Sequence, residues 1–538
     1  MPKYQNLDTC KAYFELLSLP KLDIAQALAE NGPDRIKRYE IPIGGGLQYN
    51  YAAKAVGESV LTKLEALAKE QELIPKYQAL LNGEVMNTGE NRMVLHQLTR
   101  GRLGDDVRSE GRSLSEFYQQ QNERVSAFAA AVQSGTILGS TGKPFDTVVQ
   151  IGIGGSDLGP RALYLALDNW VRADGASPKM RAEFISNVDP DDAAAVMNRV
   201  DPETTLFVLV SKSGTTQETL TNEEFVVKKL GSGTRALPAP RKHMVAVTSE
   251  SSPLAKSDAY LDAFFIDDYI GGRYSATSPV GGVVLSLCFG SDVFAAVLAG
   301  AHEADKAALE PSPRANAAML DALIGLYERN VLKLPATAVL PYSQALSRFP
   351  AHLQQLDMES NGKKVSRDGG SLSYVTGPLV FGEPGTNGQH SFYQLLHQGT
   401  DIVPLQFVGF RESQLQDDIE FQGSTGQQKL NANLAAQIVA FACGKEDENP
   451  NKHFPGSRPS SLIHGERLSP EALGALLAHF ENKVMFQGFL WNVNSFDQEG
   501  VQLGKVLTKQ VLGGDMPEHL RAFAALLGAA PEDTENYR

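Results

Sequence analysis

The chain has 538 residues, of which 42% are hydrophobic and 21% charged. That length and composition suit several buried cores and exclude a mostly disordered chain. Asp and Glu number 63 against 49 Lys and Arg, a formal net charge of −14. An acidic chain without a basic run is a poor ligand for nucleic acid or an anionic membrane. We therefore expect neither partner, and an anionic substrate would require positive charge gathered in one cleft.

Cysteine content and the first residues bear on the cellular compartment. Cys10, Cys288 and Cys443 are scattered, so they predict neither a disulfide framework nor a zinc knuckle. The sequence MPKYQNLDTC lacks an apolar core and a cleavage site of a signal peptide. No run approaches 18 consecutive apolar residues, the length of a membrane-spanning helix. These features predict a cytoplasmic protein.

Residues 1–135 have mostly helical patterning, with apolar positions at helical spacing in 55–70 and 114–133. From about residue 140 the pattern changes to alternating strands and helices. This alternation predicts a parallel sheet that binds its ligand beyond the carboxyl ends of the strands. The five apolar, strand-like runs lie in 145–151, 180–188, 204–210, 243–250 and 263–268, and the four helical segments between them in 158–170, 189–200, 215–230 and 251–258.

A second, looser α/β series follows a helical region at about 290–330. We expect it to combine with the N-terminal helices into one unit, and we interpret the polar, turn-rich stretch 444–460 as a surface loop. The expected strands lie in 336–343, 378–385 and 401–410. The expected helices lie in 344–360, near residue 390, in the amphipathic segment 469–491 and, after a turn, within 495–512.

The strongest local motif, SKSGTTQET at 211–219, follows an apolar strand and opens a helix. Unpaired backbone N–H groups at a helix start carry partial positive charge and bind phosphate. Ordinary N-capping is the alternative, but it requires only one hydroxyl. The motif supplies four hydroxyls, a glycine and a lysine, from Ser211, Lys212, Ser213, Gly214, Thr215 and Thr216.

Two glycine-rich loops also follow strands. The loop 152–157 allows close approach of a ligand, or forms a tight structural turn. It is not a dinucleotide fingerprint, because Asp157 stands where GxGxxG requires glycine. In the second loop, Arg273 follows paired glycines and points either into a cleft or to the surface.

Three further residues are candidates with ordinary alternatives. Glu359 precedes Asn–Gly at the end of a helical stretch and is either a base or a helix-terminal acid. His390 follows a polar glycine-rich turn, although most single histidines are not catalytic. Lys505 lies on an amphipathic helix and is a solvated side chain by default. The ten histidines show neither HxH nor HExxH spacing, so we expect no metal.

Seven motifs in order between about 82 and 511 resemble the glucose-6-phosphate isomerase (phosphoglucose isomerase) family of the sugar-isomerase (SIS) type. They are NGEVMNTGENRMVLH, IGIGGSDLGP, SKSGTTQET, GGRYS, DMESNGK, EPGTNGQHSFYQLLHQGT and FDQEGVQLGK. One departure is Gln502, where the family usually has Glu. The N-terminal helices and the tail after about 513 match poorly.

The resemblance implies an α/β fold of two SIS-like αβα domains with parallel or mostly parallel central sheets. Extra N-terminal helices and a C-terminal helical tail complete the chain. The smaller domain is expected at 120–289, the larger at 1–119 with 290–513, and the tail at 514–538.

The resemblance also implies reversible isomerisation of D-glucose 6-phosphate to D-fructose 6-phosphate without metal or cofactor, in glycolysis and gluconeogenesis. Glu359 would transfer the proton between C2 and C1, and Arg273 would stabilise the enediolate. His390, from the second subunit of a homodimer with shared active sites, and Lys505 would open the sugar ring. The substrate would be bound by Ser211, Lys212, Ser213, Thr215 and Thr216 at the phosphate, by Gly155, Ser156, Gln355 and Gln498 along the sugar, and by Glu218, which would orient His390.

Two alternatives remain open. Another SIS-domain sugar-phosphate isomerase would keep the phosphate loop, but it would not be expected to contain DMESNGK, GQH and FDQxGV together. A non-enzymatic sugar-phosphate sensor, or a secreted signalling role, would tolerate loss of Glu359, Arg273 or His390, and all three are present.

Overall fold

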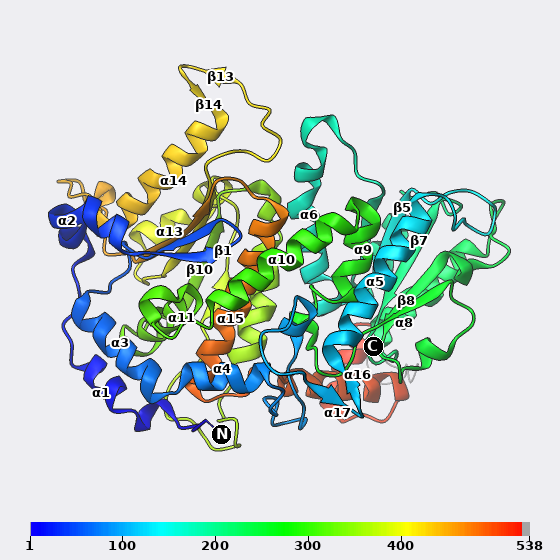
Figure 1. The fold of residues 1–538 in the computed structure, drawn as a ribbon, viewed down its shortest axis with the longest axis horizontal. Helices are drawn as coiled ribbons and strands as arrows, with labels where there is room; N and C mark the ends of the chain where they lie inside the picture. Colours follow the sequence, from blue (N-terminus) through cyan, green and yellow to red (C-terminus); the bar gives the residue numbers. More distant parts are fainter. Residues whose placement is uncertain (1, 530–538) are drawn as a thin grey trace. The chain divides into compact units, whose positions relative to one another are not determined.

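The computed structural model describes residues 2–529, apart from the side chain of residue 174. The chain divides into two units, Met1–Ser495 and Phe496–Arg538. The first unit contains two β-sheets with helices on both faces of each, which confirms the predicted α/β class (Figure 1). The domain boundaries inferred from the sequence remain a prediction.

All five strands of the smaller sheet are parallel, as predicted. In spatial order they are β6 (Arg181–Ile185), β5 (Thr147–Ile151), β7 (Thr205–Val210), β8 (Met244–Thr248) and β9 (Asp262–Phe265). The direction of strand order reverses between β5 and β7, the position at which doubly wound sheets bind ligands.

Helices cover both faces of this sheet, and its three inner strands, β5, β7 and β8, are buried along their whole length. Side chains at alternate positions, such as Phe207 and Leu209, pack against two of the helices, and the other helices cover the opposite face. The covering helices are α7 (Pro190–Met197) and α8 (Gln217–Leu230) on the first face, and α5 (Leu114–Gln133) and α9 (Pro279–Phe289) on the second.

The larger sheet has six strands and is mostly parallel. Its spatial order is β1 (Glu40–Gly44), β2 (Leu47–Asn50), β15 (Ser460–Gly465), β12 (Leu405–Phe410), β10 (Ala336–Pro341) and β11 (Leu379–Phe381). The last four strands are parallel, whereas β2 runs antiparallel to both β1 and β15. The faces are covered by α13 (Tyr393–Gln398) and α14 (Gly426–Cys443) on one side, and by α10 (Ser291–Ala307), α11 (Ala317–Leu326) and α15 (Pro470–Trp491) on the other.

Three local expectations differ from the structure. The region predicted as mostly helical contains the β1–β2 hairpin, in which inward apolar side chains alternate with more exposed ones. The predicted surface loop at 444–460 is confirmed up to residue 459, but the strand that follows it, β15, was not predicted, since this inner strand has only two apolar residues in SSLIHG. The predicted helix at 251–258 is a single 3₁₀ turn, Pro253–Lys256, started by a proline.

Helix α15 also differs from its predicted amphipathic character, because all its residues except Glu471 are buried. Its other two acidic and basic side chains are paired inside the protein instead of facing solvent: Glu481 pairs with Arg100, and Lys483 lies 3.1 Å from Asp321. Buried charges require such partners, because an isolated one would be too costly to remove from water.

The remaining helices and hairpins connect these layers. They are α1 (Lys11–Leu17), α2 (Ile24–Arg38), α3 (Glu58–Glu70), α4 (Leu73–Leu81), α6 (Leu158–Arg172), α12 (Phe349–Leu353), and the hairpins β3 (Arg108–Ser109) with β4 (Arg112–Ser113) and β13 (Glu420–Phe421) with β14 (Ser424–Thr425).

The second unit contains α16 (Gln502–Gly513) and α17 (Glu518–Leu526). The first of these matches the predicted helix at 495–512, and the second lies in the predicted C-terminal tail. Residues 530–538 of that tail lie outside the described residues.

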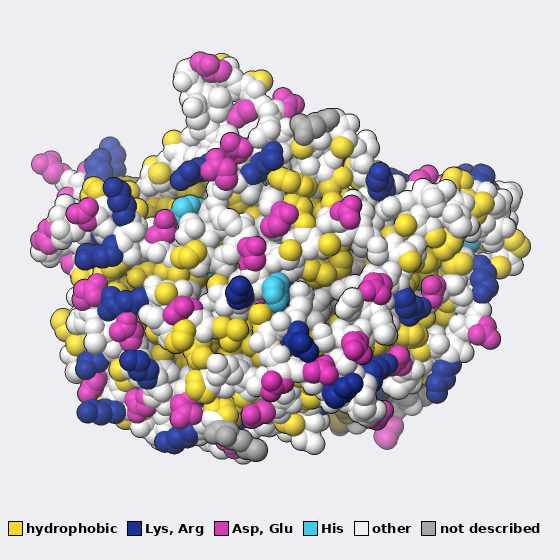
Figure 2. All heavy atoms as spheres, in the orientation of Figure 1, with side chains coloured by type: hydrophobic (Ala, Val, Ile, Leu, Met, Phe, Trp, Pro, Cys, Tyr) yellow, Lys and Arg dark blue, Asp and Glu magenta, His cyan; other side chains and the backbone are white. Residues whose placement is uncertain are grey.

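The charge distribution on the drawn face fits the composition. Among the described residues visible in Figure 2, Lys and Arg alternate with Asp and Glu, and no large area is basic alone. Across the described part of the chain, each helix is too short or too polar to cross a membrane.

Candidate active site

The glycine-rich loop after β5 packs directly against the loop that carries Arg273. A Cβ atom on Gly155 would lie 2.1 Å from the carbonyl carbon of Gly272 and 2.7 Å from the backbone nitrogen of Arg273. Only glycine permits this approach. The loop therefore forms a tight turn beside a candidate catalytic group, and its approach to a ligand remains a prediction.

The phosphate-binding motif forms the neighbouring loop, between β7 and α8. Thr216 is the N-cap residue of α8, yet its hydroxyl bonds Ser211 Oγ at 3.0 Å instead of a backbone N–H of the helix. Ser213 Oγ accepts from both the backbone N–H and the hydroxyl of Thr215, at 3.2 and 3.0 Å. The hydroxyls thus gather at a helix start, where N–H groups favour an anion.

Gly214 shapes this loop for two reasons. Its φ of +66° lies in the left-handed region, and a Cβ there would lie 2.1 Å from Ser252 Oγ. A side chain at this position would strain the backbone and displace the neighbouring loop.

Lys212 links the phosphate loop to the Arg273 loop. Its Nζ donates to the carbonyl oxygen of Ile270 at 3.1 Å and lies 4.0 Å from a carboxylate oxygen of Asp268. Burial lowers the pKa of Lys212, and the Asp268 carboxylate partly opposes this shift. A dianionic phosphate placed nearby would favour the charged form.

Glu359 and Arg273 form an ion pair, with 3.2 Å between Glu359 Oε2 and Arg273 Nη1. The arginine side chain is 1% exposed and the glutamate side chain 22% exposed. The Arg273 guanidinium, which solvent hardly reaches, therefore points at the Glu359 carboxylate, which remains accessible to a substrate. Glu359 ends a π-helical turn, Gln354–Glu359, which continues α12. Such turns inside helices are frequent at functional sites.

Two further atoms fix the Arg273 guanidinium. Its Nε donates to Ser360 Oγ at 2.7 Å, and its Nη2 donates to the carbonyl oxygen of Ser495 at 2.5 Å. These partners lie 87 and 222 residues away along the chain, so the fold and not the local sequence sets the orientation of Arg273.

Gln355, from the same π-helical turn, reaches the glycine-rich loop. A Cβ on Gly154 would lie 3.2 Å from Gln355 Nε2. Gln355 Oε1 is buried without a hydrogen-bond partner among residues 2–529. A sugar hydroxyl is a suitable donor for that oxygen. Ser156 is fixed nearby, because its carbonyl accepts from Gln150 Nε2 at 2.8 Å.

The structure does not bring every predicted residue to Glu359. His390 is exposed at the end of a 3₁₀ turn, Asn387–His390, and among the described residues no hydrogen bond or ion pair joins it to Glu359. Glu218 is half-buried in the first turn of α8. Gln498 and Lys505 belong to the second unit, so their place in the site remains a prediction.

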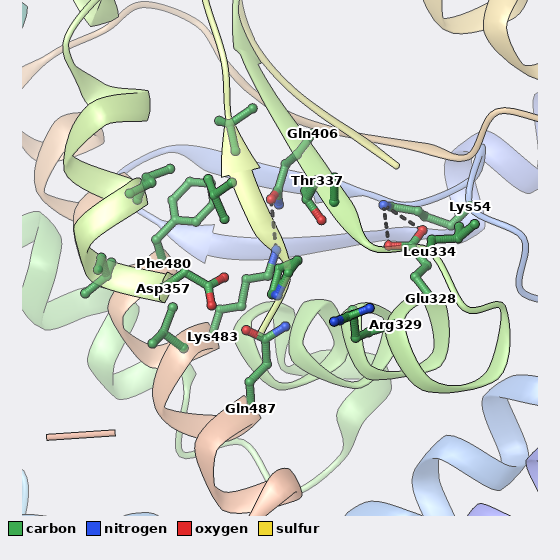
Figure 3. A pocket seen from close by; sticks show the side chains of 18 residues that line it. Lys54, Glu328, Arg329, Leu334, Thr337, Asp357, Gln406, Phe480, Lys483 and Gln487 are labelled. Carbon is green, nitrogen blue, oxygen red and sulfur yellow. Dashed lines mark hydrogen bonds and ion pairs between the residues drawn. The ribbon is translucent and has the colours of Figure 1, made fainter. Parts of the chain in front are cut away.

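A buried polar cavity lies beside the π-helical turn and was not foreseen. Asp357, two residues before Glu359, shares it with Lys483 and Gln487 from α15 and with Gln406 from β12 (Figure 3). About 30 Å³ is open to the centres of water molecules, which is room for about two waters. Burial raises the pKa of Asp357 to about 7, partly opposed by the Lys483 charge.

Sequence reasoning also missed Ser360 and Tyr274, although both lie inside recognised motifs. Ser360 Oγ accepts from Arg273 Nε and lies 3.0 Å from Tyr274 OH, so both side chains lie beside the arginine. Their position directly after Glu359 and Arg273 was the available signal. Within the described residues, no group of three or more His, Cys, Asp or Glu side chains is arranged to hold a metal ion.

Comparison with solved structures first defines the class of protein. The chain superposes on a crystal structure of a glucose-6-phosphate isomerase from Chlamydia trachomatis with a TM-score of 0.89 and 42% identity, covering 97% of this chain and 99% of that one. A hypothetical protein from Thermus thermophilus matches with a TM-score of 0.64 and 28% identity, over 85% of this chain and 98% of that one. The two-sheet α/β fold is therefore shared with a sugar-phosphate isomerase.

Sequence comparison then identifies the family. The Phosphoglucose isomerase family profile matches residues 50–521. A glucose-6-phosphate isomerase from Treponema denticola is 60% identical over 531 residues, 98% of this chain and 100% of that protein. One from Treponema pallidum (strain Nichols) is 59% identical over 536 residues, 99% of each. The chain belongs to the phosphoglucose isomerase family.

Proposed function

We propose that the chain reversibly isomerises D-glucose 6-phosphate and D-fructose 6-phosphate, the aldose–ketose step of glycolysis and gluconeogenesis. The observation that carries this proposal is the Glu359–Arg273 pair, held at 3.2 Å beside the glycine-rich loop at the sheet's switch point. Membership of the family, with relatives of that activity about 60% identical over the full length, supports it.

The central step moves a proton from C2 to C1 of the open-chain sugar through a cis-enediolate. Glu359 is the base that accepts the proton and returns it, because one carboxylate on one face of the substrate reaches both carbons. Arg273 stabilises the negative oxygen that develops as the proton leaves. Arginine suits this role because it stays charged and does not compete for the proton.

Phosphate binding anchors the substrate at a point remote from the reacting carbons. Ser211, Ser213 and Thr216 offer hydroxyls at the start of α8, and Lys212 adds charge beside them. Contacts remote from the reacting atoms supply positioning energy for the chemistry. Gly155, Ser156 and Gln355 contact the sugar, and we extend this role to Gln498 in the second unit.

Ring opening requires an acid for the ring oxygen and a base for the C1 hydroxyl, which we assign to His390 and Lys505. His390 is exposed in one chain, and we propose that it enters the active site of the partner subunit in a homodimer, where Glu218 orients it.

The proposal includes a cytoplasmic location and a division into domains at 120–289 and at 1–119 with 290–513. Pairing of β2 with β15 supports joining the N-terminal residues to the larger sheet.

The proposal is tested by assaying the purified chain for isomerisation of fructose 6-phosphate, coupled to glucose-6-phosphate oxidation, in the presence of EDTA. We expect activity that chelation and added divalent ions leave unchanged. Loss of activity with chelator and recovery with a metal would contradict the cofactor-free mechanism. Preference for an amino sugar phosphate would favour the alternative isomerase, and binding without turnover would favour a sensor.

A further inference from the structure

A small group of buried side chains lies behind the Arg273–Glu359 pair. Ser360 is 0% exposed and Tyr274 is 1% exposed. Ser360 Oγ lies 2.7 Å from Arg273 Nε and 3.0 Å from Tyr274 OH. Because an arginine side chain can only donate, Ser360 Oγ must accept from Nε, and its remaining hydrogen-bonding capacity serves the tyrosine hydroxyl.

The tyrosine ring is itself supported from behind by His96. The two rings stack with centroids 4.5 Å apart and an interplanar angle of 28°. Both His96 nitrogens are buried without a hydrogen-bond partner among the described residues. Burial, together with the charges of Arg100 and Arg273, holds the pKa of His96 well below its usual range. The imidazole is therefore a neutral, flat packing surface at this position.

We propose that Ser360 and Tyr274 are positioning residues that direct the Arg273 guanidinium at the developing enediolate, with Tyr274 held in place by the His96 ring. The inference rests on the proposed isomerase function. Without the Ser360 hydroxyl, Arg273 Nε would lose the acceptor that Ser360 provides in a site that solvent hardly reaches, and the guanidinium would be less firmly oriented. Because Ser360 follows Glu359 directly, one short segment sets both members of the catalytic pair.

The inference predicts a loss in kcat more than in KM. Hydrogen bonds to charged groups contribute about 1.5–3 kcal/mol, so Ser360→Ala should lower kcat roughly 10- to 100-fold while KM changes less than about threefold. Ser360→Thr keeps the hydroxyl and should recover most of the rate. Tyr274→Phe should give a smaller loss, and Tyr164→Phe, which removes a buried tyrosine hydroxyl that accepts from the backbone N–H of Ala182, should have no effect.

Inhibitor binding separates a positioning role from a structural one. A five-carbon aldonic acid 5-phosphate carries a carboxylate that mimics the enediolate charge, whereas the matching sugar alcohol 5-phosphate is neutral there. We expect Ser360→Ala to weaken binding of the acid by about the factor lost in kcat and to leave binding of the alcohol unchanged. Equal weakening of both inhibitors, or an unchanged kcat, would overturn the proposal.

The ring of His96 is tested separately. His96→Phe keeps the stacking surface and should retain activity, whereas His96→Ala should resemble Tyr274→Phe. If His96→Phe is as damaging as His96→Ala, the nitrogens matter and the packing role is wrong. If Ser360→Ala does not fold, Tyr274→Phe and the two inhibitors still decide. Calorimetry with the acid measures binding at Arg273 even if the chain proves inactive as an isomerase. Failure of the proposed function can therefore be distinguished from failure of the positioning role.

Discussion

The Arg273 guanidinium uses each of its three nitrogens in a different direction, toward Glu359, Ser360 and Ser495. A lysine ammonium would keep the charge and lose this planar fork. We predict that Arg273→Lys lowers kcat about 10²–10³-fold, the usual effect of removing one donor to a developing oxyanion. Arg411→Lys, which alters a solvent-exposed arginine ion pair of 3.3 Å with Glu466, should be neutral. A kcat for Arg273→Lys close to the wild-type value would contradict the role.

The buried Asp357 carboxyl predicts a pH dependence of stability. Its pKa rises from 3.8 to about 7 on folding, chiefly through burial. A carboxyl that binds its proton more tightly when folded stabilises the protein below pH 4, and this contribution is lost as pH rises toward 7. The Asp357→Asn side chain cannot ionise. As pH increases from 4 to 8, the free energy of unfolding of the variant minus that of the wild type should therefore increase by at least about 1 kcal/mol. Denaturant curves at several pH values measure this difference, with exposed Asp34→Asn as control. A difference that does not change with pH would contradict the buried acid.

At the scale of elements, the loop between β7 and α8 predicts selectivity for the phosphate. Two hydrogen bonds to a charged group are worth roughly 3–6 kcal/mol, so Ser211→Ala combined with Thr216→Ala should raise KM for fructose 6-phosphate about 100-fold or more. The matched control is Ser134→Ala with Thr136→Ala, an exposed hydroxyl pair also 3.0 Å apart. An unchanged KM, or competition by glucose as effective as by its 6-phosphate, would place the phosphate elsewhere.

The elements that could be predicted are those with strong local patterns. The five strands of the smaller sheet lie in apolar-rich runs that alternate with polar segments, and all five are confirmed. The β1–β2 hairpin and β15 escaped prediction because their places depend on partners more than 400 residues apart, such as Ile463 opposite Tyr49. Helix α15 looked amphipathic because the partners of its charges, Arg100 and Asp321, are distant in the sequence.

The same distinction holds for the site. Motifs pointed to Arg273 and Glu359, which the structure pairs. They did not single out Ser360 or Tyr274, although each directly follows a candidate residue, because the hydrogen bond between them spans 86 residues. The Asp357 cavity was not foreseen because its other polar side chains come from α15 and β12, which are distant in the sequence. The proposed roles of His390, Gln498 and Lys505 depend on the arrangement of a second subunit or of the second unit, so they remain predictions.

At the scale of the whole molecule, a homodimer with shared sites predicts complementation between inactive chains. Mixing His390→Ala with Glu359→Gln subunits, under conditions that allow exchange, should restore activity, because one of the two sites in each heterodimer would be intact. Size-exclusion chromatography with differently tagged chains would verify exchange. Exchange without recovered activity would place His390 in the site of its own subunit, or outside the site.

The most direct test of the central claim, that Glu359 is the proton-transfer base, is the activity of Glu359→Gln. The amide has the same shape and cannot accept the C2 proton. We predict that kcat falls by at least about 10²–10⁴-fold, the usual contribution of a general base, while calorimetry shows nearly unchanged substrate affinity. Glu466→Gln, from the exposed arginine pair, is the control and should retain full activity. A loss smaller than about tenfold would show that another group is the base.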